Sequence, residues 1–94
     1  MEKREWTNFI DELKRRSDMV DVVSQYAVVQ QKGRRFWARC PIHNEKTPSF
    51  SINREAQTFY CFGCHAGGDV IKFVEDIEGI GFMEAVEHLA KRAN

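Results

Sequence analysis

The sequence lacks several features that would place it in common structural classes. It has only three cysteines, an odd number that leaves no complete disulfide scheme. Its amino terminus has no apolar signal core, and no apolar stretch approaches the ~20 residues needed to span a bilayer. Its net charge is zero, with 14 basic and 14 acidic side chains. We therefore expect a soluble cytoplasmic protein without a membrane partner, rather than a secreted disulfide scaffold.

The neutral total conceals an uneven distribution of charge. Residues 32–54 carry six lysines and arginines against one acidic residue, Glu45, whereas acidic residues outnumber basic ones over 1–31 and 55–94. Such a basic segment inside a neutral chain favours a polyanionic partner. The length of 94 residues predicts a single domain over residues 1–94, with a modest core that a metal ion would help to stabilise.

The three cysteines and one histidine form two pairs, Cys40-Pro-Ile-His43 and Cys61-Phe-Gly-Cys64, with seventeen residues between them. Three thiolates and one imidazole match the tetrahedral ligand set of a structural zinc ion, and each spacing lets a short backbone turn direct two ligands at one ion. We predict one Zn²⁺ bound by Cys40, His43, Cys61 and Cys64. No position is left for water, so the role would be structural, and the thiols require a reducing compartment.

Three other interpretations of these residues exist. The cysteines could fill a core while His43 lies on the surface, but chance rarely produces both spacings together. Alternatively, Cys61 and Cys64 could form a thioredoxin-like dithiol, which would leave Cys40 and His43 unexplained. His65 could also replace His43 as a ligand, although adjacent residues seldom both face one tetrahedral ion.

Hydrophobic periodicity predicts an α+β fold in which helices flank an antiparallel sheet. Helices are expected at about residues 4–25, divided by a Ser17-Asp18 cap, and at about 69–92, divided by Gly79-Ile80-Gly81. The sheet would occupy about residues 27–64. Its four strand segments are Val28–Gln31, Arg34–Arg39, Ser49–Asn53 and Thr58–Cys61.

Local residues suggest how these elements begin, end and turn. Lys32-Gly33 is a plausible hairpin turn, and Asp69 can cap the third helix. Gly63 suits a turn that needs a positive φ and a close approach of amides to sulfur. Gly67-Gly68 is expected to interrupt the backbone pattern. Phe82, Met83, Val86, Leu89 and Ala90 define the last helix, which is expected to run to about Arg92.

Basic and aromatic residues alternate in the segment Arg34-Arg35-Phe36-Trp37-Ala38-Arg39. On a strand this places Arg35, Trp37 and Arg39 on one face. If the other face covers the helices, a cationic surface with exposed rings remains, which is how proteins hold single-stranded nucleic acid. The alternative is that many of the aromatic residues are core and the basic residues are merely solvated. We favour binding because the basic segment coincides with the sheet.

The runs from Cys40 to Ser51 (CPIHNEKTPSFS) and from Phe59 to Asp69 (FYCFGCHAGGD) closely resemble the zinc-binding domain of bacterial DNA primase. The resemblance extends to Val20-Asp21-Val22-Val23 and to Ile77-Glu78-Gly79, so it covers nearly the whole chain. It implies a zinc-ribbon sheet flanked by helices, with Cys40, His43, Cys61 and Cys64 as the zinc ligands. It also implies a role in selecting the single-stranded DNA template where RNA primers start.

The resemblance also suggests which residues contact DNA and what the chain needs from other proteins. The implied contacts are Arg34, Arg35, Trp37, Arg39, Lys46, Phe50 and Arg54. The primase RNA polymerase domain, with its magnesium-binding carboxylates, and the helicase-interacting region are not in this sequence. We therefore expect a non-catalytic domain that binds single-stranded DNA for a polymerase domain in the same or another chain, reaching the replicative helicase only through absent regions. The alternative function is a zinc-stapled adaptor that contacts the polymerase domain.

Overall fold

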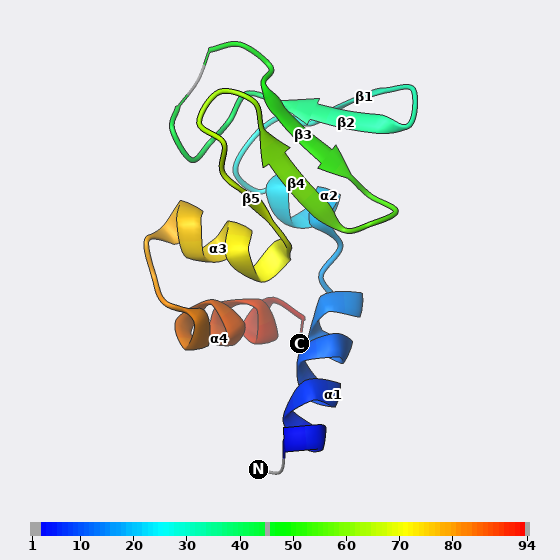
Figure 1. Ribbon diagram of the computed structural model, residues 1–94, viewed down its shortest axis with the longest axis vertical. Coiled ribbons are helices and arrows are strands. Elements are labelled where there is room, and N and C mark those ends of the chain that lie inside the picture. Colours follow the sequence, from blue (N-terminus) through cyan, green and yellow to red (C-terminus); the bar gives the residue numbers. More distant parts are fainter. Residues whose placement is uncertain (1–2, 45, 94) are drawn as a thin grey trace.

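The computed structural model describes residues 3–44 and 46–93, and these form a layer of sheet packed on a layer of helices. Figure 1 shows the sheet at one end of the molecule, α3 and α4 beneath it, and α1 running away from it. The α+β class with an antiparallel sheet and flanking helices, predicted from the sequence, is therefore confirmed. The helices are α1 (Lys3–Arg15), α2 (Met19–Val23), α3 (Val70–Glu78) and α4 (Phe82–Ala93).

The sheet is a meander in which each strand pairs with the next, all antiparallel, in the order β1-β2-β3-β4-β5. Its strands are β1 (Gln30–Lys32), β2 (Arg35–Ala38), β3 (Phe50–Asn53), β4 (Thr58–Cys61) and β5 (Gly67–Gly68). The register aligns Ala38, Phe50 and Cys61 across three strands. It also aligns Trp37, Ser51 and Tyr60, which by the two-residue period lie on the opposite face.

The core lies between the sheet and helices α2 and α3. Phe50 and Phe59 stack with ring centroids 5.2 Å apart, and Phe73 of α3 meets both edge-on at 5.7 and 5.5 Å. Met19 and Val23 of α2 are fully buried in the same cluster. Side chains of this size each contribute about 1.5–3 kcal/mol when buried, so this cluster fixes which face of the sheet meets the helices.

Capping residues set the helix boundaries, as the sequence suggested. The Asp69 carboxylate accepts a hydrogen bond from the Lys72 amide (2.9 Å) at the start of α3. Gly79 ends this helix in the left-handed conformation, with a φ of 65°. The Asp69 carboxylate also forms an ion pair with Lys14 at the end of α1 (2.9 Å), so it joins α1 to the start of α3.

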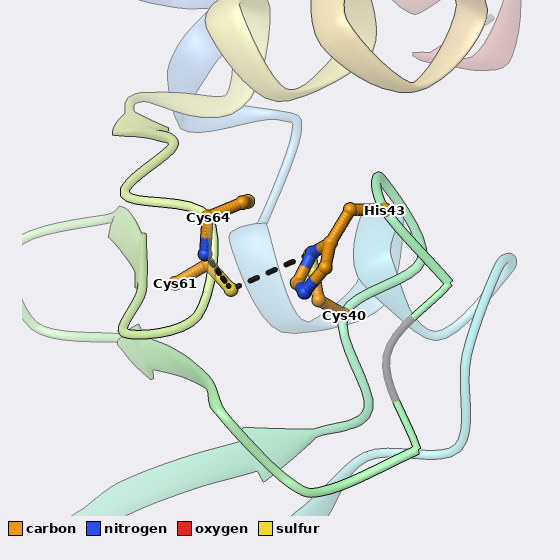
Figure 2. A group of neighbouring side chains, drawn as sticks. All are labelled: Cys40, His43, Cys61 and Cys64. Carbon is orange, nitrogen blue, oxygen red and sulfur yellow. Dashed lines mark hydrogen bonds between the residues drawn. The ribbon is translucent and has the colours of Figure 1, made fainter.

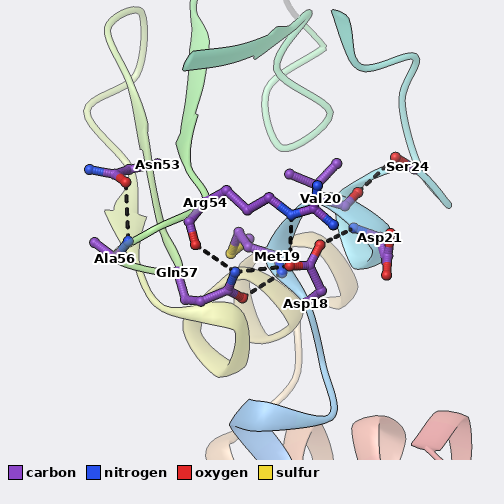
Figure 3. A network of polar contacts seen from close by, with 9 residues as sticks. All are labelled: Asp18, Met19, Val20, Asp21, Ser24, Asn53, Arg54, Ala56 and Gln57. Carbon is purple, nitrogen blue, oxygen red and sulfur yellow. Dashed lines mark hydrogen bonds and ion pairs between the residues drawn. The ribbon is translucent and has the colours of Figure 1, made fainter. Parts of the chain in front are cut away.

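A polar clasp ties the start of α2 to the turn between β3 and β4 (Figure 3). Asp18 caps α2 by accepting from the Asp21 amide (3.1 Å), and it also accepts from Arg54 (3.1 Å) and from the Gln57 side chain (3.0 Å). Gln57 completes the clasp because its side-chain oxygen accepts from the Met19 amide at 2.7 Å. The clasp therefore holds α2 beneath the sheet from the side away from the two Cys/His pairs.

The turns and edges differ from the sequence expectations in three places. The first hairpin turns at Gly33-Arg34, one residue later than expected, with Gly33 at a φ of 65°. The first strand begins at Gln30, and Val28 remains 82% exposed. Gly67-Gly68 does not interrupt the backbone pattern but forms β5 against β4. A strand is predicted from side chains that alternate between apolar and polar along the sequence. Two glycines have no side chains, so the sequence does not indicate a strand here.

The last helix buries only some of the apolar residues that define it. Val86 and Leu89 are buried, but Phe82 and Met83 are 43% and 56% exposed. Ala85 is also fully buried. Among the described residues, no helix is long and apolar enough to cross a membrane.

Candidate metal centre and nucleic-acid surface

Two loops bring the four predicted metal ligands together. The first loop follows β2 and carries Cys40 and His43, and the second begins at Cys61, the last residue of β4, and carries Cys64. Figure 2 shows the two pairs facing one another from these loops. One donor atom from each residue lies within 4.8 Å of every other, and His43 Nδ1 is 3.8 Å from Cys61 Sγ.

The second loop is a tight turn built around the Cys61 sulfur. The amides of Gly63 and Cys64 point at this sulfur, at 3.3 and 3.5 Å. The turn is closed by hydrogen bonds from the His65 amide to the Cys61 carbonyl and from the Cys61 amide to the Ala66 carbonyl, both 2.8 Å. Donation from backbone amides offsets negative charge on sulfur, so the turn favours a thiolate at Cys61.

Gly63 is required in this turn for a different reason from the one expected. Its φ is not positive; the residue in the left-handed region is His65, at 66°. A Cβ at Gly63 would lie 3.0 Å from His43 Nε2 and 3.3 Å from the Ser49 hydroxyl oxygen. Glycine therefore leaves room for the His43 ring, which couples the second loop to the ligand on the first.

The surroundings of the two buried thiols, Cys40 and Cys61, shift their pKa values in opposite directions. Burial raises the pKa of Cys40 to about 12, and the neighbouring Cys61 adds to this rise. Burial also acts to raise the pKa of Cys61, but hydrogen bonds from the Cys64 amide, the Ser49 hydroxyl and the Gly63 amide outweigh burial and lower it to about 7. Negative charge is thus favoured at Cys61, one of the four donors.

The donor set fits a tetrahedral zinc ion. Zinc–sulfur bonds of about 2.3 Å and zinc–nitrogen bonds of about 2.0–2.1 Å give tetrahedral donor–donor distances of about 3.5–3.8 Å, and Cys61 Sγ lies 3.8 Å from His43 Nδ1. The other donors approach this spacing within the 4.8 Å limit. Cys64 is exposed, which argues against cysteines that merely fill a core. His65 is outside the cluster, and its Nδ1 lies 2.8 Å from the Tyr60 hydroxyl.

The face of the sheet away from the helices carries an aromatic surface. Trp37 of β2 stacks against Phe62 with centroids 6.1 Å apart, and Phe62 meets Tyr60 of β4 edge-on at 5.0 Å. Tyr60 is 40% and Phe62 60% exposed. Ser51 lies between Trp37 and Tyr60 in the register and is buried, and its hydroxyl accepts a hydrogen bond from Arg35 (3.0 Å). We call Trp37, Tyr60 and Phe62, with Arg35 beside them, the aromatic platform.

Five of the seven predicted contact residues lie on the aromatic platform or at exposed positions next to the sheet. Arg35 and Trp37 lie on the aromatic platform, and Arg39 is exposed just beyond the end of β2. Arg34 is exposed but lies in the hairpin turn rather than on a strand face. Lys46 is exposed in the loop after His43, beside Glu45, a residue outside the described ranges.

Two of the predicted contacts have other roles in the structure. The expectation of an exposed ring at Phe50 is wrong, because Phe50 is fully buried and stacks on Phe59. Arg54 is held in the polar clasp by Asp18, and its guanidinium lies 5.8 Å from the centre of the Phe36 ring. Both residues stabilise the fold, and the strand period explains Phe50: it aligns with Ala38 and Cys61 on the buried face.

The sequence interpretation did not single out Tyr60 and Phe62 as contacts. The signal that could have found Tyr60 is the alternation in β4, where Phe59 and Cys61 are buried while Thr58 and Tyr60 are exposed. Once Phe59 is assigned to the core, Tyr60 must lie on the outer face. Phe62 follows the last strand residue, so the strand period does not reach it.

Comparison with known proteins decides the family. The CHC2 zinc finger pattern matches residues 5–94. The chain belongs to the CHC2 zinc finger family. Its relatives include the DNA primases of Halalkalibacterium halodurans (49% identity over 85 residues) and Geobacillus stearothermophilus (49% over 84 residues). These matches cover 90% and 89% of this chain but only 14% of either primase, so the chain spans about a seventh of those relatives.

A solved structure shows the same fold. The crystal structure of the Aquifex aeolicus primase, containing its zinc-binding and RNA polymerase domains, superposes with a TM-score of 0.83 at 47% identity. The match covers 90% of this chain and 21% of that one. The family and the geometry together assign Cys40, His43, Cys61 and Cys64 to one zinc ion.

This CHC2 site has a structural role. All four coordination positions are taken by protein donors, and bound zinc supplies a rigid link between the loops rather than a site for substrate. The chain's own residues prepare that link, through the amides around Cys61 and the space that Gly63 leaves for His43. The dithiol alternative is disfavoured because it uses only two residues of a four-residue cluster.

Proposed function

We propose that residues 1–94 form the zinc-binding domain of a bacterial DNA primase and hold the single-stranded DNA template while RNA primer synthesis begins. The observation that carries this proposal is the aromatic platform: three rings and Arg35 on the sheet face opposite the core. Rings of this kind stack on bases while cations meet phosphates, which is how single strands are bound without sequence preference. Zinc fixes the loops that flank the platform.

The distribution of charge supports the same surface. Arg34, Arg35, Arg39 and Lys46 are exposed on or next to the sheet. The acidic side chains that the helices carry engage basic neighbours in several ion pairs, such as Glu12 with Arg15 and Asp76 with Lys72. Positive charge therefore remains concentrated at the sheet end of a molecule whose net charge is zero.

The proposal is tested by measuring the affinity of the zinc-loaded chain for a fluorescent single strand at several salt concentrations. We expect Phe62→Ala to weaken binding by about fivefold or more through lost stacking. We expect Arg35→Ala to lower the salt dependence by about 0.7 log unit per decade, the value of one phosphate contact on a single strand. Arg4→Ala is the matched control, because Figure 1 places that end of α1 far from the sheet.

The outcomes separate the proposal from the adaptor alternative. Loss of affinity in Phe62→Ala and Arg35→Ala, with Arg4→Ala unchanged, supports template binding. Binding to an isolated primase polymerase domain, with no affinity for single strands at low salt, would overturn it. In a reconstituted primase, we also expect Lys46→Ala to reduce primer initiation while the chain keeps its zinc.

A further inference from the structure

A groove beside the first metal-binding loop adjoins the aromatic platform. It has a volume of about 720 Å³, within the range of small-ligand sites, and lies where the α2–β1 connection, β2 and the loop after Cys40 meet. Trp37 lines it and also belongs to the aromatic platform, so the two surfaces are continuous. A strand that crosses the platform can therefore continue into the groove past Trp37.

The lining combines features that suit a nucleobase with its adjoining phosphate. Val28 and Pro48 supply apolar surface, and Val28 is 82% exposed, so a flat ring would cover it. The charged side chains that line the groove in the described part of the chain are Arg39 and Lys46, both basic. An apolar floor with cationic edges fits a base and its phosphate better than an apolar peptide.

Two amide side chains, Gln30 and Asn44, also line the groove. Each offers a donor and an acceptor, the combination that pairs with the edges of bases. The platform can stack any base, since every base has an aromatic face, but amides on a groove wall distinguish one base edge from another. The groove thus offers chemistry that the platform lacks.

We propose that this groove takes one unstacked base of the bound single strand and that Gln30 and Asn44 read its edge. The inference rests on the proposed function, because the strand is delivered by the platform. It adds a base preference at one template position, with Arg39 and Lys46 meeting the neighbouring phosphate. Unstacking is cheapest for a base that is already in a single strand.

The test uses the zinc-loaded chain and a set of oligothymidylates in which one central position is T, A, C or G. We expect the wild type to prefer one base by about fivefold or more, the lower end of what a paired amide contributes. Gln30→Ala and Asn44→Gly should reduce this ratio toward one while retaining affinity for the least favoured strand. Glycine is chosen at position 44 because Asn44 has a φ of 55°, which glycine adopts without strain.

Gln31→Ala is the matched control, since Gln31 is the next residue of the same strand and does not line the groove. It should keep the wild-type preference, and zinc content and circular dichroism should be equal in all variants. Equal affinity of the wild type for all four strands, or a preference that survives in both groove variants, would overturn the inference while leaving strand binding intact. Tighter binding of free nucleoside triphosphates than of strands, lost in the groove variants, would also overturn it. If no strand binds at all, the proposed function itself fails.

Discussion

At the scale of single residues, the metal ligands were the most predictable part of the molecule. Two short spacings and the ligand types decided Cys40, His43, Cys61 and Cys64, because zinc restricts both chemistry and local geometry. The packing around the ligands was less predictable. Gly63 was expected to provide a positive φ, but it makes room for His43, which approaches from another loop. Sequence spacing carries no information on such a contact.

Gly63→Ala should therefore weaken zinc binding without unfolding the chain. The added methyl group would lie 3.0 Å from His43 Nε2, so the imidazole must shift. We expect zinc affinity to fall by about tenfold, the lower end of losses seen when the support of a ligand is disturbed. Competition with a chromogenic chelator measures this.

Gly81→Ala provides the comparison, because a Cβ there meets nothing within 4 Å and its φ is not positive. Its zinc affinity should match the wild type. If both variants retain zinc equally well, the contact between Gly63 and the His43 ring has no energetic importance.

At the scale of elements, the helices were predicted well and the sheet edges poorly. Helical periodicity and the Asp18, Asp69 and Gly79 caps are local signals, so α1 to α4 begin and end within a few residues of expectation. The edge strand β5 consists of two glycines and depends on its pairing with β4, which no local pattern reveals.

Asp69 should contribute to stability through both of its contacts. Asp69→Ala removes the cap of α3 and the ion pair with Lys14, so we expect a loss of about 1–2 kcal/mol in unfolding free energy. Asp69→Asn keeps a capping side chain and should lose less than half of that. Urea unfolding of the zinc-loaded variants measures both, and equal losses would show that the ion pair, not the cap, dominates.

The polar clasp should show a small coupling between Asp18 and Arg54. Burial acts to raise the pKa of Asp18, but hydrogen bonds from Gln57, Arg54 and the Asp21 amide keep it below its usual range. The pair is partly exposed, so a double-mutant cycle with Asp18→Asn and Arg54→Ala should give about 0.5 kcal/mol at pH 7.

The sign of the pH dependence follows from the lowered pKa. At acid pH the unfolded chain binds the proton more readily than the folded chain, so the contribution of Asp18 is complete above its unfolded pKa of about 3.9 and is lost as the pH falls further. The coupling should thus shrink in acid. Zero coupling at pH 7, or a coupling that grows in acid, would contradict this role for the clasp.

At the scale of the whole molecule, the layered architecture was predictable, but the exposed surface was only partly so. The basic segment was located correctly on the sheet, whereas Phe50 and Phe59 could not be told from Tyr60 and Phe62 by composition. Whether each ring is buried or exposed depends on the strand register and on Phe73 of α3, which packs against Phe50 and Phe59. Contacts between distant segments thus decided which rings form the core and which form the platform.

Removing zinc with a chelator at neutral pH should loosen the sheet end first. Structural zinc contributes about 10–16 kcal/mol of apparent free energy, which matches or exceeds the stability of a small domain. We expect amide hydrogen exchange to rise earliest in residues 40–44 and 61–66, and α1 and α4 to follow later because they lie away from the ion. Exchange that rises uniformly along the chain would show instead that the domain unfolds as one unit.

The consecutive pairing of β1 to β5 also bears on how the chain acquires its structure. Each strand after β1 pairs with the strand that precedes it in the sequence. Little chain entropy is therefore lost in closing each hairpin, and topologies of this kind fold rapidly. All four ligands lie within residues 40–64, in adjacent hairpins of that meander. During synthesis the sheet can therefore assemble in the order in which it leaves the ribosome, and all four ligands emerge before α3 and α4 do.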